Sequence, residues 1–213
     1  PDVPPTRVLW GQRSKDEMGD LWFQLLAKTD ADRARLNDEI TAKMVAEDIV
    51  GYETMLTVTP DDHELHDDVA LLYLGMGKPL DAVRHFRASA ASRGAPAPAH
   101  YNLGTALAVA GQLDEAVREY ERAIAIDPQY AVAFANLGSV LLQQGRTKAA
   151  LKRLERAVQL APQNVEALNG LSVAYAAEGD IERALATIER ALRLNPAPAL
   201  QKLLRQRREM LEK

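Results

Sequence analysis

The chain has 213 residues, no cysteine and a formal net charge of -4 at pH 7. The lack of cysteine excludes a disulfide framework and a zinc–thiolate site, and the mildly acidic balance argues against a nucleic-acid partner. No apolar run reaches the roughly 18 residues of a membrane-spanning helix, so we expect no membrane partner either.

The N-terminal sixty residues predict an extended start followed by helices. Residues 1–13 hold three prolines and show no clear hydrophobic period, which indicates an extended segment. Ser14 and Glu17 have the spacing of a capping box, in which each side chain satisfies backbone N–H groups at a helix start. A longer second helix should end near Leu56, so that residues 14–62 form a helical region containing a degenerate half-repeat.

Residues 7–18 read Arg-Val-Leu-Trp-Gly-Gln-Arg-Ser-Lys-Asp-Glu-Met. This segment resembles the tail of the copper type II, ascorbate-dependent monooxygenase domain. The resemblance implies that Met18 is the counterpart of that family's copper-ligating methionine. The family's site also needs two histidines, and no histidine precedes His63, so we do not expect this chain to build it. The resemblance then implies the C-terminal part of a longer secreted or periplasmic enzyme; alternatively, Met18 is ordinary helix packing.

A fixed period, equal to the spacing from Gly77 to Gly111, organises the remainder of the chain. A period of about 34 residues is typical of stacked helix-turn-helix units. One column of the repeat holds glycines at expected turns, where a positive φ is common. Another holds alanines, which let two helices pack closely. A third holds bulky residues, expected to fill the space to the next unit. The columns are Gly77, Gly111, Gly145 and Gly179; Ala82, Ala116, Ala150 and Ala184; and Phe86, Tyr120, Leu154 and Ile188.

The residues of the unit 97–130 resemble the tetratricopeptide repeat (TPR) family through Asn102-Leu103-Gly104, Gly111, Ala116, Tyr120, Ala123 and Asp127-Pro128. The pattern recurs in residues 131–164 and 165–198, and more loosely in residues 63–96, where Gly94 replaces the expected proline. The resemblance implies an all-α, right-handed superhelical solenoid of helix-turn-helix repeats.

Residues 199–213 predict one further helix that caps the stack, because the last repeat needs a polar-backed cover. Its leucines should cover the last repeat and its basic residues should face water. The leucines are Leu200, Leu203, Leu204 and Leu211; the basic residues are Lys202, Arg205, Arg207 and Arg208.

The resemblance implies that the first helix of each repeat lines a concave groove that binds a protein or peptide partner. These helices, expected at 63–76, 97–110, 131–144 and 165–178, contain no lysine or arginine. We therefore expect a neutral to mildly acidic groove and no clamp for a partner's C-terminal carboxylate. The clamp positions implied by the family hold Asp67, Tyr101, Thr105, Ala135, Ser139 and Asn169.

Asn102 and Asn136 share one column of the repeat, with Asp68 before them and Gly170 after them. An amide both donates to and accepts from a peptide unit, so such a ladder is suited to an extended chain. Alternatively, these amides satisfy nearby backbone groups. Apolar neighbours should add contact area. The candidate groove residues are Asp68, Tyr101, Asn102, Thr105, Val109, Asn136, Ser139, Leu142, Asn169 and Val173.

Residues 61–68 form the only metal-like cluster of the sequence, with His63 and His66 three residues apart among five acidic residues. A zinc or nickel site is conceivable on this spacing, but acidic residues are also expected at a helix start. No glycine-rich phosphate loop or nucleophile motif is present.

We therefore expect a non-enzymatic interaction scaffold without a cofactor, binding a largely uncharged segment of a protein partner. A second interpretation is a regulatory or oligomerising tail of a monooxygenase-like enzyme. A third is a metal-dependent hydrolase that uses His63 and His66. Homo-oligomerisation and the compartment (cytoplasmic, or periplasmic or secreted) stay open.

Overall fold

The computed structural model describes residues 30–92 and 94–212, with side chains described from residue 38 onward. The chain forms two compact units, residues 1–55 and 56–213. The described residues form helices and no strand, as the sequence predicts. None of the described helices combines the length and apolar character needed to span a lipid bilayer.

The described part of the first unit is helix α2, which runs from Asp30 to Leu56 without interruption. Its end at Leu56 agrees with the end expected from the sequence. Ile49 and Leu56 of this helix are buried, whereas the apolar side chains of Ile40 and Met44 are exposed. The extended segment 1–13, the capping box and Met18 lie outside the described residues.

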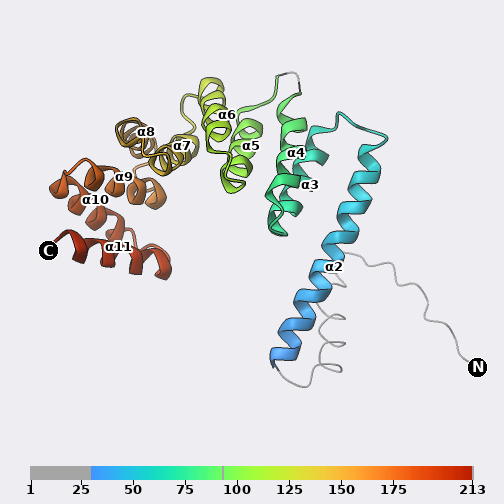
Figure 1. Cartoon of the computed structure of the whole chain (residues 1–213), viewed down its shortest axis with the longest axis horizontal. Helices are drawn as coiled ribbons and strands as arrows, with labels where there is room; N and C mark the ends of the chain where they lie inside the picture. Colours follow the sequence, from blue (N-terminus) through green and yellow to red (C-terminus); the bar gives the residue numbers. More distant parts are fainter. Residues whose placement is uncertain (1–29, 93, 213) are drawn as a thin grey trace, which may run out of the picture. The chain divides into compact units, whose positions relative to one another are not determined.

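The second unit consists of four helix pairs and a final helix (Figure 1). Each helix contacts the next along the chain, and the first helices α5, α7 and α9 also contact one another in sequence. This contact pattern is that of a solenoid, in which each pair packs on its neighbours. The pairs are α3 (His63–Gly75) with α4 (Pro79–Ala90), α5 (Ala97–Val109) with α6 (Leu113–Ile126), α7 (Ala131–Gln143) with α8 (Thr147–Leu160), and α9 (Val165–Ala177) with α10 (Ile181–Arg193).

A glycine in the left-handed backbone region ends the first helix of every pair. In the second pair Gly111 has φ +78°, and the next N–H, that of Gln112, donates to the Leu107 carbonyl at 2.8 Å. This is a Schellman motif, which needs a residue that tolerates positive φ. The same bond recurs at the matching position of the other repeats, from Lys78 to Tyr73, from Arg146 to Leu141 and from Asp180 to Tyr175.

Small residues on the first helices receive bulky residues of the second helices. A Cβ added to Gly104 would lie 2.9 Å from the Tyr120 ring, and one added to Gly138 would lie 2.4 Å from Leu154 Cγ. Tyr120 and Leu154 therefore pack inside their own helix pairs. Both side chains also reach the next unit, as expected for this column: Leu154 packs against Gly170, and the Tyr120 hydroxyl lies at the side chain of Asn136.

The final helix, α11, runs from Pro198 to Leu211 and packs against α10. Leu204 is fully buried, as expected for a cap, whereas Leu203 is 43% exposed and does not cover the last repeat as predicted. Lys202 and Arg205 are exposed, but Arg207 and Arg208 are half-buried, so neither of these two faces water as fully as predicted. The prediction that Arg207 faces water is therefore wrong, because its side chain lies against α9.

Candidate functional site

The predicted groove residues gather on the first helices, on a surface that we call the first-helix face. It is lined by side chains that are all half-buried and recur in register because each repeat has the same length. They are Tyr101, Asn102 and Thr105 on α5, Asn136, Ser139 and Leu142 on α7, and Asn169 and Val173 on α9. Two predicted residues differ in exposure: Val109 is 63% exposed, and Asp68 is exposed on α3.

Tyr101 is the centre of the polar contacts on this face. The Asn136 amide donates to the Tyr101 hydroxyl at 3.1 Å, which joins α7 to α5. The Tyr101 ring lies 5.2 Å from the Tyr130 ring and 5.9 Å from the Tyr120 ring, in tilted arrangements that favour aromatic contact. These contacts hold Tyr101 in one orientation beside the two asparagines.

Thr105 is held below this cluster by two hydrogen bonds. Its hydroxyl donates to the Tyr101 carbonyl at 3.0 Å and accepts from the Tyr120 hydroxyl at 3.2 Å. Burial raises the pKa of Tyr120, so its phenol stays protonated and continues to donate at neutral pH. Ser139, at the matching position of α7, donates to the Ala135 carbonyl of its own helix at 3.1 Å.

The two ladder asparagines differ in how much of the amide remains available. Asn136 uses its NH₂ group on Tyr101, and its carbonyl oxygen has no hydrogen-bond partner among the described residues. The Asn102 amide makes no side-chain hydrogen bond within the described part of the chain. Gly170 and the buried Leu204 occupy the next two positions of the column. The amide pair is therefore confined to α5 and α7.

Arg207 reaches the same face from α11. Its Nη1 atom donates to Asn169 Oδ1 at 2.6 Å and to Ser172 Oγ at 3.3 Å. Burial of this guanidinium lowers the pKa of Arg207, because removal from water disfavours the charged form. The cap therefore supplies a cation to α9, whereas the sequence predicted that the basic residues of the cap face water.

The acidic histidine segment acts as a helix start in the structure. Asp62 caps α3 by accepting from the Leu65 N–H at 3.1 Å. Within the described residues no group of three histidine or carboxylate side chains is arranged to hold a metal ion. The capping interpretation of this segment therefore fits the geometry, and His63 is exposed at the first position of α3.

His66 belongs to a hydrogen-bonded chain between α3 and α4. Arg84 Nη2 lies 3.0 Å from His85 Nε2, so that nitrogen must accept, and His85 Nδ1 carries the proton. His85 Nδ1 then donates to His66 Nδ1 at 3.0 Å, and His66 Nε2 donates to the Pro60 carbonyl at 3.0 Å. Both ring nitrogens of His66 are engaged in this arrangement, so none is left for a metal.

The second repeat has a polar pair at the matching positions. His100 Nδ1 lies 2.8 Å from Glu119 Oε2, and Arg122 donates to Glu119 Oε1 at 2.7 Å. Sequence reasoning missed both pairs. A signal was present in the sequence. The pair His100 and Glu119 lies one repeat after the pair His66 and His85, and the two members of each pair have the same separation along the chain.

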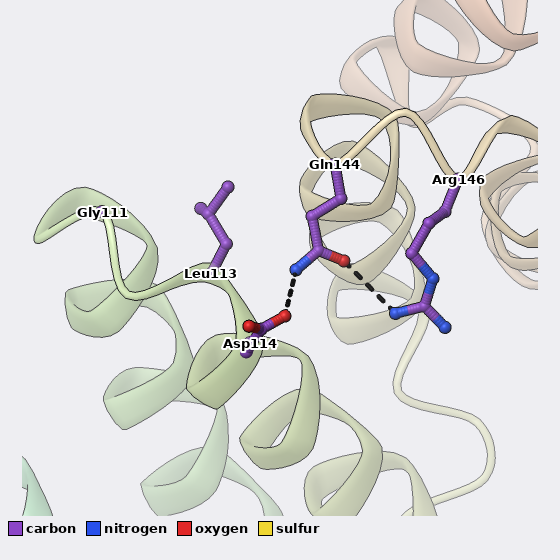
Figure 2. Close-up of a pocket in the computed structure, with 5 residues that line it drawn as sticks. All are labelled: Gly111, Leu113, Asp114, Gln144 and Arg146. Carbon is purple, nitrogen blue, oxygen red and sulfur yellow. Dashed lines mark hydrogen bonds between the residues drawn. The ribbon is translucent and has the colours of Figure 1, made fainter.

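A shallow open depression lies between the turns of the second and third helix pairs (Figure 2). Gln144 donates to Asp114 Oδ1 at 2.8 Å, and Arg146 donates to Gln144 Oε1 at 3.2 Å. Gly111 and Leu113 complete its lining. None of the five lining residues belongs to the predicted groove, and their polar groups already pair with one another.

Two family models match the chain: a tetratricopeptide repeat model over residues 141–207 and a TPR repeat model over residues 106–145. No curated protein matches. The fold is similar to that of solved TPR structures. A crystal structure of MamA has a TM-score of 0.67 at 24% identity, covering 80% of this chain and 96% of that chain.

Two further structures support the same fold. MamA 41-end from Desulfovibrio magneticus RS-1 has a TM-score of 0.60 at 24% identity, covering 71% of this chain and 90% of that one. YrrB, described as a TPR protein with an unusual peptide-binding site, has a TM-score of 0.64 at 19% identity, covering 82% of this chain and 89% of that one. The predicted all-α solenoid is thus confirmed: tetratricopeptide repeat models match residues between 106 and 207, and the fold is that of the TPR solenoids.

Proposed function

We propose that the chain is a protein-interaction scaffold whose first-helix face binds an extended, largely uncharged segment of a partner protein. The observation that carries this proposal is the register of Asn102 and Asn136 beside Tyr101. Asn102 keeps its whole amide available, and Asn136 keeps its carbonyl oxygen available. An amide pair on adjacent repeats offers donors and acceptors at intervals along an extended backbone.

The composition of the face supports a partner segment with few charges in its middle part. Helices α5, α7 and α9 contain no lysine or arginine, and Glu166 is their only acidic residue. Half-buried Tyr101, Leu142 and Val173 add apolar area next to the amides. Apolar contact supplies affinity and the amides align the backbone. A scaffold of this kind also agrees with the peptide-binding description of the similar structure YrrB.

The two other functions expected from the sequence have less support. The segment 7–18, which carries the resemblance to a monooxygenase tail, lies outside the described residues. The hydrolase interpretation requires His66 as a ligand, and both of its ring nitrogens are engaged by His85 and Pro60. We therefore favour the scaffold over both alternatives, and over an enzyme in general.

Panning of a phage-displayed library of random short peptides on the full chain tests the proposal. We expect enriched peptides whose affinity falls about fivefold for Asn102→Ala and for Asn136→Ala, since a net hydrogen bond contributes on the order of 1 kcal/mol. Gln159→Ala, which removes an exposed amide on α8, is the matched control and should bind normally. Absence of any enriched peptide, or unchanged affinity in both asparagine variants, would contradict the proposal.

A further inference from the structure

We propose that Arg207 recognises an acidic side chain, Asp or Glu, in the partner segment bound on the first-helix face. This pairing sets which end of the segment lies against α9 and α11. The inference rests on the proposed function and deepens it, because it adds one charged position to an otherwise uncharged segment.

The register of the repeat places Arg207 on the binding face. Thr105, Ser139 and Val173 occupy one column of that face, and Arg207 follows Val173 by one further repeat period. The hydrogen bond from Arg207 to Asn169 shows that α11 presents this position toward α9. Helix α11 therefore continues the row of first helices, although no second helix follows it among the described residues.

The bonding of Arg207 leaves its charge without a counter-ion. Its two acceptors, Asn169 Oδ1 and Ser172 Oγ, are both neutral and both bind Nη1. No carboxylate pairs with Arg207 among the described residues. A guanidinium carries five N–H donors in a planar fork that matches a carboxylate in bidentate geometry. A half-buried cation of this kind gains more from a carboxylate than an exposed one does, since the surrounding water screens it less.

The two ends of the face differ in charge, which makes the pairing directional. Glu64 on α3 and Glu166 on α9 are exposed acids of one repeat column and are common to both ends, so the difference lies in the exposed Asp68 at the α3 end and in Arg207 at the α9 and α11 end. An acidic residue of the partner is therefore repelled at one end and attracted at the other. A segment with its acidic residue near one terminus should bind in a single direction.

The peptides enriched on the wild-type chain and on Arg207 variants test this inference. In a library fused to the phage coat protein through its C-terminus, acids in the selected peptides are side chains rather than a chain end. We expect Asp or Glu to be enriched at one position on the wild type and on Arg207→Lys. The enrichment should disappear on Arg207→Gln, although peptides with the same uncharged core are still selected. Arg205→Gln, an exposed neighbour on α11, is the matched control and should keep the enrichment.

A double-mutant cycle with one selected peptide provides the second measurement. Replacing its acidic residue by the amide should weaken binding to the wild type about tenfold and leave binding to Arg207→Gln unchanged, as expected for a directly coupled charge pair. A merely structural role of Arg207 would lower affinity equally for both peptides. That result, or selected peptides without an enriched acidic residue, would overturn the inference about Arg207. The proposed function as a peptide-binding scaffold would not be affected. A library that yields no enriched peptide at all would contradict both the inference about Arg207 and the proposed scaffold function.

Discussion

Leu154 packs so closely on Gly138 that an added Cβ would lie 2.4 Å from Leu154 Cγ. Cγ is the branch point of the side chain, so it cannot move away without changing the leucine rotamer. We expect Gly138→Ala to lower the free energy of unfolding by about 1–3 kcal/mol, the usual range for overpacking. Urea denaturation followed by circular dichroism measures this change.

Two companion variants make that prediction specific. A Cβ added at Gly170 would also lie close to Leu154, at 2.9 Å from its terminal Cδ2 atom. Gly170→Ala should therefore lower the free energy of unfolding by less than Gly138→Ala does. The double variant Gly138→Ala with Leu154→Ala should lose less stability than the sum of the single variants, because the smaller side chain makes room for the methyl group. Additive losses would show that the two residues are not coupled.

The turn glycines are required for their backbone conformation and not for space. Gly145 has φ +71°, and an added Cβ would meet nothing within 4 Å. We expect Gly145→Ala to destabilise the chain by about 1–2 kcal/mol, the penalty of an L-residue in the left-handed region. Gly145→Asn should destabilise the chain by less than Gly145→Ala does. Gly75→Ala, at a helical glycine that also has open space, is the control and should not destabilise. Equal losses at Gly75 and Gly145 would contradict this reason.

The solenoid was predictable because its determinants are local and repeated. Each turn needs one glycine and each helix crossing needs one small residue, so both constraints recur once in every repeat and are visible without coordinates. The pairing of Gly104 with Tyr120 was less visible, since a column of bulky residues does not reveal which neighbour it faces. Only the packing shows that the Tyr120 ring faces Gly104 of its own repeat.

The cap and the histidine chain show why parts of the site were missed. Arg207 is one of four basic residues of α11 that were expected to face water, and composition alone does not show which of them turn inward. Extending the register of the repeats by one unit would have placed it with Val173. The contact between His85 and His66 was missed because His66 is on the preceding helix. Long-range polar pairs of this kind depend on how the helices pack and on the direction of each side chain.

Asp67 links stability to pH. Burial raises the pKa of its carboxyl above the ordinary 3.8, while the nearby Ser89 hydroxyl and His63 partly oppose this shift. The Asp67 Oδ1 and Ser89 Oγ atoms are buried without a well-formed hydrogen bond. The folded state therefore binds a proton more readily than the unfolded state. Stability from this group is present below pH 3.8 and falls as the pH rises through the raised folded pKa.

It follows that Asp67→Asn should raise the melting temperature at pH 7, where the wild type carries the buried charge, and give no such gain near pH 3. Thermal denaturation of both proteins at the two pH values measures the difference. Asp68→Asn, at the exposed neighbour, is the control and should show little pH-dependent gain. A gain for Asp67→Asn of equal size at both pH values would show that the carboxyl's ionisation is not the cause.

The chain from Arg84 through His85 and His66 to Pro60 is structural in our interpretation, and its loss should be costly. His66→Ala removes the bond from His85 Nδ1 and the bond to the Pro60 carbonyl, so we expect a loss of about 1–3 kcal/mol in the free energy of unfolding. His63→Ala, at an exposed position three residues earlier, should stay within about 0.5 kcal/mol of the wild type.

Zinc separates this structural role from the metal interpretation of the same segment. A ligand that binds only the folded state raises the melting temperature, because it adds RT ln(1 + [L]/Kd) to the free energy of unfolding. Because both nitrogens of His66 are engaged, micromolar zinc should leave the melting temperature of the wild type unchanged. A zinc-dependent rise that disappears in both His63→Ala and His66→Ala would instead mean that the two imidazoles rearrange to hold a metal, and the tautomers assigned to His66 and His85 would have to be abandoned.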